Sequence, residues 1–212
     1  MRIVLLSILI VLLLSAPTPE QPQHISPTAA SIEEVAVPVA PVDLREYKFQ
    51  ALQERVARMN PAVPPETARS IAREVICASE KYGLPPELIV AVIETESAYD
   101  VRVVNAYGAY GLMQVVYRYW YEELPTPDPE LLRTVHHNVD VGSRILRQYH
   151  DRFGSRQYLV KYGGWRDREH GARYLGNIER RSRQVRAHME AVLDGADAKD
   201  ITGVWHACVR AP

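Results

Sequence analysis

The stretch Ile93–Gln114, IETESAYDVRVVNAYGAYGLMQ, decides how the rest of the chain can be interpreted. It begins at the end of an apolar segment, residues 88–93, and presents two carboxylates, Glu94 and Glu96. After a polar connection it closes in the glycine-bracketed segment 108–114, GAYGLMQ. A carboxylate at the end of a buried helix, opposite a glycine-shaped loop with an amide at its tip, suits acid catalysis.

Only one of the two carboxylates can face a given cleft. Residues two positions apart on an α-helix point about 200° away from each other. Glu96 lies nearer the end of the predicted helix, so its side chain can project into a pocket, and we take it as the candidate general acid. We expect Glu94 to face solvent or an ion-pair partner.

Composition bounds the class of protein. The chain has 212 residues, 47% of them hydrophobic and 24% charged, with a formal net charge of −1, which suits one main domain with extensions. The balanced charge gives no support for a nucleic-acid partner. Four arginines crowd one segment, 180–186, which we interpret as a solvated helix face; a patch that meets an anionic polymer or a membrane is the alternative.

The N-terminus has the pattern of an export signal. Met1 and Arg2 precede a mostly apolar run without charges, residues 3–14, which Ser7 alone interrupts, followed by Ser15 and Ala16. This run is shorter than the roughly 20 residues needed to span a bilayer. We therefore predict a signal peptide over residues 1–16 and export to the periplasm or cell envelope. An uncleaved anchor is the alternative, because a proline follows Ala16 directly.

The remaining chain divides into three parts. Residues 17–42 form a Pro-rich linker, residues 43–195 a folded domain, and residues 196–212 a C-terminal tail. Apolar periodicity and proline or glycine boundaries predict a mainly α domain with few strand signals. The helices are expected over 44–59, 64–82, 85–96, 131–135, 139–153, 156–162 and 172–193, the fifth of them capped by Asn138.

The chain has two cysteines, Cys77 and Cys208. In an oxidising compartment two cysteines can form one disulfide. Cys77 also lies on an apolar helical face, where it would serve as a small core residue. The sequence leaves both interpretations open.

Several blocks together carry a family resemblance. The segment 96–100, ESAYD, followed by Asn105 and the 108–114 loop, resembles the SLT-type lytic transglycosylases of the goose-lysozyme-like superfamily, which show Glu-Ser and then Gly-Ala-x-Gly-Leu-Met-Gln. The similarity extends over about residues 85–178, through the segment N-x-x-x-G at 138–142 and two later tyrosines, Tyr162 and Tyr174. The resemblance implies a lysozyme-like, mainly α fold.

The resemblance also implies a reaction. Such enzymes cleave the β-1,4 bond between N-acetylmuramic acid (MurNAc) and N-acetylglucosamine (GlcNAc) in peptidoglycan and leave 1,6-anhydro-MurNAc ends. Glu96 would be the single general acid and base, and no cofactor or metal would be needed. The sugar's own 6-hydroxyl would replace water as the attacking group, an intramolecular reaction that benefits from high effective concentration.

The same resemblance assigns substrate-binding residues. Gln114 is expected to donate to the sugar or its N-acetyl group, with a loop-bracing hydrogen bond as the alternative. Met113 would form part of the pocket floor or pack in the core, and Tyr162 would place its hydroxyl near the reacting centre, stabilising charge or holding Glu96. Tyr110 could stack on a sugar or belong to the core, as could the aromatics at 117–120. Ser97, Asn138 and the His136–His137 pair are expected to be structural.

The chain departs from the family at Gly163, where relatives have asparagine, and this weakens the expected sugar-binding network. Two rival functions stay open. A lysozyme-type hydrolase would need a second carboxylate, from Asp100 or the 122–130 loop. A non-catalytic cell-wall-binding or assembly module would keep the fold without turnover. From its size and the resemblance, we expect an enzyme that opens the wall for an envelope-spanning secretion or conjugation machine.

Overall fold

The computed structural model describes residues 44–154, 156–195 and 208. The predicted signal peptide, the Pro-rich linker and most of the C-terminal tail lie outside these residues. Within them the protein is mainly α, as predicted. None of the described helices is long and apolar enough to cross a membrane.

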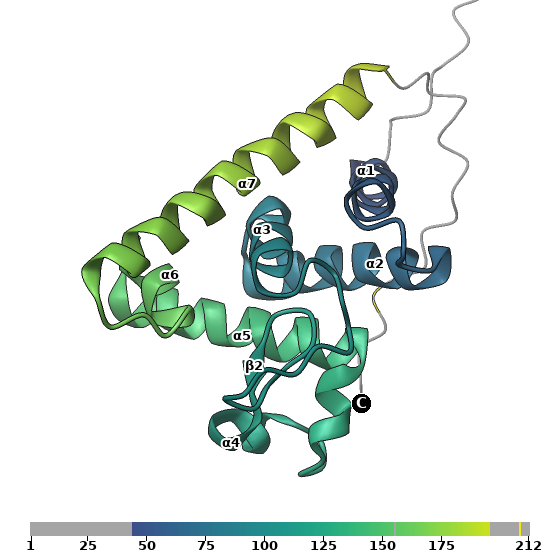
Figure 1. Cartoon of the computed structure of the whole chain (residues 1–212). Coiled ribbons are helices and arrows are strands. Elements are labelled where there is room, and N and C mark those ends of the chain that lie inside the picture. Colours follow the sequence, from purple (N-terminus) through teal and green to yellow (C-terminus); the bar gives the residue numbers. More distant parts are fainter. Residues whose placement is uncertain (1–43, 155, 196–207, 209–212) are drawn as a thin grey trace, which may run out of the picture. The chain divides into compact units, whose positions relative to one another are not determined.

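Seven α-helices carry the described part of the fold (Figure 1). They are α1 (Leu44–Met59), α2 (Pro65–Tyr82), α3 (Pro86–Glu96), α4 (Tyr117–Trp120), α5 (Val135–Phe153), α6 (Gln157–Tyr162) and α7 (Arg168–Gly195). Two short 3-10 helices, η1 (Tyr121–Glu123) and η2 (Pro129–Arg133), connect α4 to α5.

The glycine loop is part of a small β-hairpin. This hairpin was not predicted from the sequence. Strand β1 (Ala109–Tyr110) pairs antiparallel with β2 (Val115–Val116), placing Ala109 opposite Val116 and Tyr110 opposite Val115. Two-residue strands are too short to show the alternating pattern by which strands are recognised. The hairpin places residues 111–114 at its turn.

Three predicted boundaries are corrected by the structure. Helix α5 begins at Val135 and its N-cap is Thr134, whose side chain accepts a hydrogen bond from the amide of His137, so Asn138 is not the cap. In place of the predicted helix at 131–135, residues 129–133 form the 3-10 helix η2 and Val135 begins α5. Helix α7 begins earlier than predicted, at Arg168, and the side chain of Asp167 accepts a 2.8 Å hydrogen bond from the amide of His170 in its first turn.

Helix α3 is the centre of the core. Its residues 89–93 are at most 1% exposed, so its middle is covered on all sides. It packs against α7 and α2; helix α2 also contacts α1 and α5, and α5 contacts α6 (Figure 1). A proline in the first turn begins α3, and Ser97 follows its last residue. The core therefore holds the C-terminal end of α3, with its two carboxylates, in a fixed position.

Cys77 and Cys208 form a disulfide, with an S–S distance of 2.13 Å. The bond joins α2 to a residue of the C-terminal tail across a sequence separation of 131. A cross-link over so long a loop restricts the unfolded chain strongly. Of the two alternatives for the cysteines, the structure therefore supports the disulfide.

Candidate active site

Glu96 is the last residue of α3, and its half-buried carboxylate contacts α7. The hydroxyl of Tyr174 donates a 2.5 Å hydrogen bond to Glu96 Oε1. Burial raises the pKa of Glu96 to about 7, because it removes the carboxylate from water, and this outweighs the hydrogen bond from Tyr174, which lowers the pKa. A carboxyl group that titrates near neutrality can donate a proton and then take one back.

Glu94 has a structural role, because it forms buried ion pairs. Its side chain is 1% exposed and lies between two guanidinium groups. Arg55 donates to it at 2.8 and 3.1 Å, Arg181 at 3.2 Å, and the hydroxyl of Tyr99 at 2.8 Å. The expectation that Glu94 has an ion-pair partner is therefore confirmed, with two partners in place of one.

The chain turns sharply just after Glu96. Ser97 donates from its hydroxyl to the carbonyl of Ile93 at 3.1 Å and accepts from the amide of Tyr99 at 3.2 Å, so it makes the helix-end bond that was expected. Ala98 and Tyr99 have left-handed backbone angles, with φ of +47° and +69°. Such angles cost roughly 1 kcal/mol or more each in non-glycine residues. The surrounding contacts overcome this cost and hold the carboxylate at the helix end.

Asn138 fastens the glycine loop to α5. Its Oδ1 accepts from the amide of Met113 at 2.7 Å, and its Nδ2 donates to the carbonyls of Tyr110 at 2.8 Å and Leu132 at 2.6 Å. Gly111 has a φ of +67°, and a Cβ there would lie 2.4 Å from the Leu132 carbonyl and 2.5 Å from Asn138 Nδ2. Glycine is thus needed at 111 for close packing on Asn138.

Tyr162 contacts the glycine loop at Met113. The Met113 side chain is fully buried, and a Cβ at Gly142 would lie 2.6 Å from its sulfur, so it packs in the core and is not an exposed pocket floor. The Tyr162 hydroxyl donates to the Met113 carbonyl at 2.8 Å, not to Glu96 as one of the expectations had it. Burial and the nearby negative charge of Glu96 raise the pKa of Tyr162 well above its usual value. Tyr162 therefore lies near Glu96 but supports the loop.

Gln114 is the last residue of the hairpin turn, and Tyr110 is the residue just before it. The Gln114 amide nitrogen donates to the carbonyls of Gly111 at 3.1 Å and Val103 at 3.3 Å, which is the loop-bracing alternative. Tyr110 is half-buried, with the guanidinium of Arg133 5.9 Å from its ring centroid. Sugar binding by Gln114 and Tyr110 stays a prediction.

Two aromatic residues near Glu96 have roles that the sequence analysis did not assign. Tyr174 was noted only as a residue of the family pattern, and the structure makes it the partner of the catalytic candidate. Trp165 packs beside Tyr174, and its indole lies 2.8 Å from the position of a Cβ at Gly163. An asparagine at 163, as in the family, would collide with this indole. The order Tyr-Gly-Gly-Trp at 162–165 was the available signal.

The carboxylates considered as a second catalytic group have other partners. Asp100 accepts a 2.8 Å hydrogen bond from the amide of Arg102. In the 122–130 loop, the partners of Glu122, Glu123, Asp128 and Glu130 are Tyr121, Arg144, the Glu130 amide and Arg133. Glu96 differs from these carboxylates because burial raises its pKa to about 7.

The histidine pair lies in the first turn of α5, inside the helix and not before it. Nδ1 of His136 lies 2.9 Å from Glu74 Oε2, and His137 contacts Thr134. Among the described residues, no group of three or more His, Cys, Asp and Glu side chains could hold a metal ion.

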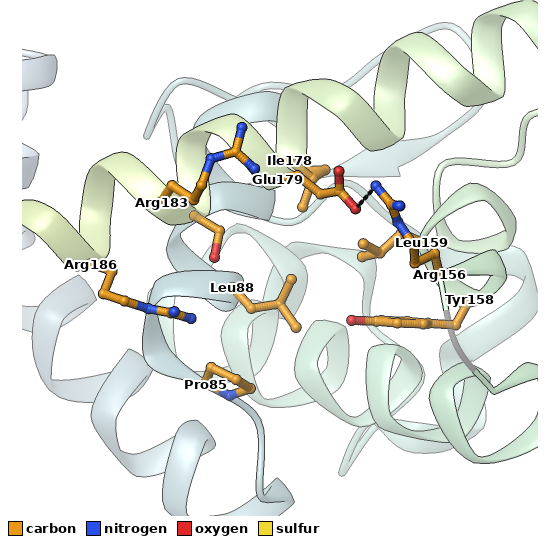
Figure 2. A pocket seen from close by; sticks show the side chains of 10 residues that line it. Pro85, Leu88, Arg156, Tyr158, Leu159, Ile178, Glu179, Arg183 and Arg186 are labelled. Atoms are coloured by element: carbon orange, nitrogen blue, oxygen red, sulfur yellow. Dashed lines mark ion pairs between the residues drawn. The ribbon is translucent and has the colours of Figure 1, made fainter.

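A separate groove of about 450 Å³ lies between the start of α3 and helices α6 and α7, and Glu96 is not among the residues that line it (Figure 2). Its rim carries Arg156, Arg183 and Arg186 over a floor that includes Leu88 and Ile178, and Arg156 pairs with Glu179. Two arginines of the 180–186 cluster are held by α3 itself, Arg181 by Glu94 and Arg186 by Glu87. Part of the arginine cluster therefore joins α7 to α3 through ion pairs and is not simply a solvated helix face.

Comparison with known proteins finds similarity to one family over part of the chain. The model of the family described as Transglycosylase SLT domain matches residues 73–163. A curated relative, "Transglycosylase" of Enterobacteria phage PRD1, is 31% identical over 110 residues, which are 48% of this chain and 38% of the relative. The chain thus spans well under half of that relative's length. No solved structure matches the chain significantly. The family match contains Glu96, Asn138 and Tyr162 and ends before Tyr174.

Proposed function

We propose that the chain is a peptidoglycan lytic transglycosylase, because the model of the Transglycosylase SLT domain family matches residues 73–163. It cleaves the β-1,4 bond between MurNAc and GlcNAc and leaves 1,6-anhydro-MurNAc ends. One observation carries the proposal: Glu96, at the end of a buried helix, has a pKa raised to about 7 and a hydrogen bond from Tyr174. This is the behaviour required of a single group that acts as acid and then as base.

In the first step, Glu96 protonates the bridging oxygen between the two sugars. The bond from this oxygen to C1 of MurNAc breaks, and positive charge develops at C1. Tyr174 holds Glu96 Oε1, so we assign the transferred proton to Oε2, which accepts no hydrogen bond within the described residues. The GlcNAc-containing product leaves with a free 4-hydroxyl.

In the second step, the Glu96 carboxylate takes the proton from the 6-hydroxyl of the same MurNAc. The 6-oxygen attacks C1, which closes the 1,6-anhydro ring and returns Glu96 to its protonated form. The attacking group and its target belong to one sugar, so the step has the advantage of an intramolecular reaction. The Tyr174 hydroxyl stabilises the carboxylate while it is charged between the two steps.

A hydrolase would need a second carboxylate to activate water or to form a covalent intermediate. Asp100 and three carboxylates of the 122–130 loop have partners within three residues along the chain, and Glu123 pairs with Arg144 of α5. These contacts favour intramolecular ring closure over attack by water.

The test is digestion of purified peptidoglycan with the full chain, followed by mass spectrometry of the products. We expect anhydro-MurNAc ends, each lighter by one water than a reducing end, and no products from Glu96→Gln, which should still bind glycan. Reducing ends would support the hydrolase. Binding without products from the unaltered chain would support the non-catalytic module.

We further propose that the chain is exported and acts in the periplasm or cell envelope, where peptidoglycan lies. The apolar run within residues 1–16 supports this location. Opening the wall for an envelope-spanning secretion or conjugation machine is the proposed role. Fractionation of cells that express the full chain, with and without residues 1–16, tests the export signal: retention of both forms in the cytoplasm would contradict it.

A further inference from the structure

Trp165 is an exposed aromatic residue one ring contact away from the partner of Glu96. It lies in the connection between α6 and α7, and its ring centroid is 6.3 Å from that of Tyr174, whose hydroxyl binds Glu96. The residue is 40% exposed. Tyr107 and Tyr119 are more exposed, but neither has a ring contact with Tyr174 within the described residues. Trp165 is thus joined to the proposed catalytic carboxylate through the single intervening side chain of Tyr174.

The indole is held in place although it is exposed. The imidazole of His170 stacks on it with a centroid distance of 5.4 Å and an interplanar angle of 14°. His170 is itself positioned by Asp167, whose Oδ1 lies 2.6 Å from the imidazole Nδ1. A rigid aromatic surface loses little conformational freedom when a ligand binds to it.

The backbone at Gly163 makes room for the indole. A Cβ at this position would lie 2.8 Å from Cδ1 and Nε1 of Trp165 and 2.9 Å from Cζ of Tyr174. Any side chain at 163 would therefore displace the indole or the tyrosine that holds Glu96. The indole N–H makes no hydrogen bond to any residue in the described part of the chain.

We propose that Trp165 binds a pyranose ring of the glycan strand beside the bond that Glu96 protonates. A sugar ring of peptidoglycan offers a face of C–H groups that packs on the indole, and hydroxyl or acetamido oxygens that can accept from its N–H. The inference rests on the proposed function and adds a sugar-binding residue to it. Trp165 and Gly163 together then supply a donor where the family has an asparagine.

The test measures binding of peptide-free glycan strands by calorimetry, with all variants made in the non-cleaving Glu96→Gln background of the full chain. We expect Trp165→Ala to raise the Kd about tenfold, equal to about 1.4 kcal/mol, and Trp165→Phe to recover most of the affinity. Trp120 contacts Tyr149 edge-on and packs against the core, which favours the core alternative for this residue, so Trp120→Phe is the control for Trp165→Phe. Equal Kd values for Trp165→Ala and its parent would overturn the proposal.

A second measurement separates sugar binding from support of Tyr174. With Glu96 intact, we expect Trp165→Ala to raise KM while kcat and the pH at which activity declines stay unchanged. A fall in kcat and a shifted pH profile, with unchanged glycan affinity, would mean that Trp165 only positions Tyr174, and would overturn the proposal. If the Glu96→Gln parent binds no glycan at all, the proposed function fails, and this inference fails with it.

A double-mutant cycle tests the link to Gly163. Gly163→Asn should weaken glycan binding as much as Trp165→Ala does, because it displaces the indole. In the Trp165→Ala background the same change should cost much less, since the indole is no longer present to be displaced. Independent, additive losses would contradict the steric link between the two residues.

Discussion

The hydroxyl of Tyr174 on α7 donates a hydrogen bond to Oε1 of Glu96 at the end of α3, across 78 positions of sequence. A hydrogen bond to a carboxylate stabilises its charged form, so this contact opposes the effect of burial on the pKa of Glu96. The two influences leave the pKa at about 7. Burial is thus the main cause of the raised pKa of the proposed catalytic group, and Tyr174 limits how far it rises.

Tyr174→Phe should raise the pKa of Glu96 further, because burial then acts unopposed. Glu96 must be protonated to start the reaction, so activity should persist to higher pH than in the unaltered enzyme. The pH profile of kcat/KM, which reports the free enzyme, measures this directly. At the same time kcat should fall, since the charged carboxylate between the two steps loses its donor.

The matched control is Tyr162→Phe. Its hydroxyl donates to the Met113 carbonyl and not to Glu96, so the position of the pH profile should not move, whatever happens to the rate. An equal displacement of the profile in both tyrosine variants would show that the hydroxyl of Tyr174 has no specific effect on Glu96.

Glu96→Gln should stabilise the fold at high pH. The pKa of Glu96 is about 7 in the folded protein, against an ordinary value of 4.5, so between these pH values the folded state binds more protons than the unfolded state. Stability contributed by this group is thus greatest below about pH 4.5 and declines until the pH passes 7. Glutamine removes the cost of burying the charge, a gain of about 1–3 kcal/mol.

Urea unfolding at pH 4.5 and pH 8 measures this difference between the two proteins. The gain should be present at pH 8 and small at pH 4.5. A Glu96→Gln protein that is less stable than its parent at pH 8 would contradict the burial of the carboxylate.

Glu94→Gln should have the opposite effect on stability. It leaves Arg55 and Arg181 without their buried negative partner, and breaking a buried ion pair in this way costs about 3–5 kcal/mol. The urea midpoint should fall by a corresponding amount at neutral pH. For protein that remains folded, the pH profile of activity should stay in place. A stable Glu94→Gln protein with a displaced pH profile would mean that the roles of the two glutamates are reversed.

Asn138→Ala should loosen the glycine loop. It removes the partner of three backbone groups, the buried Met113 amide and Leu132 carbonyl and the partly buried Tyr110 carbonyl, at about 1–3 kcal/mol for each buried group left without a partner. Asn138→Asp should be at least as harmful at neutral pH, because a carboxylate would face two carbonyl oxygens. Thermal unfolding checks both. Unchanged melting temperatures would show that the loop does not depend on this side chain.

The helices of the site were predictable because their signals are local. Pro65 and Pro86 begin α2 and α3 in the first turn, where a missing N–H costs nothing, and Gly83 ends α2 with a φ of +62°. The boundary of α5 was wrong because Thr134 and Asn138 are both plausible caps. In the structure the Asn138 side chain donates to the carbonyl of Leu132 in η2 and is therefore directed toward the loop, so Thr134 is the cap.

The sequence by itself determined the helical class, the position of Glu96 at the end of a buried helix and the glycines of the facing loop, since each follows from residues within a few turns of one another. The tertiary structure alone decided which side chains meet Glu96 and Glu94. Tyr174 and Arg181 reach them from 78 and 87 residues away, and Trp165 lies beside Tyr174 only because Gly163 has no side chain. Such contacts depend on how α3, α6 and α7 pack together, and no local pattern encodes that arrangement.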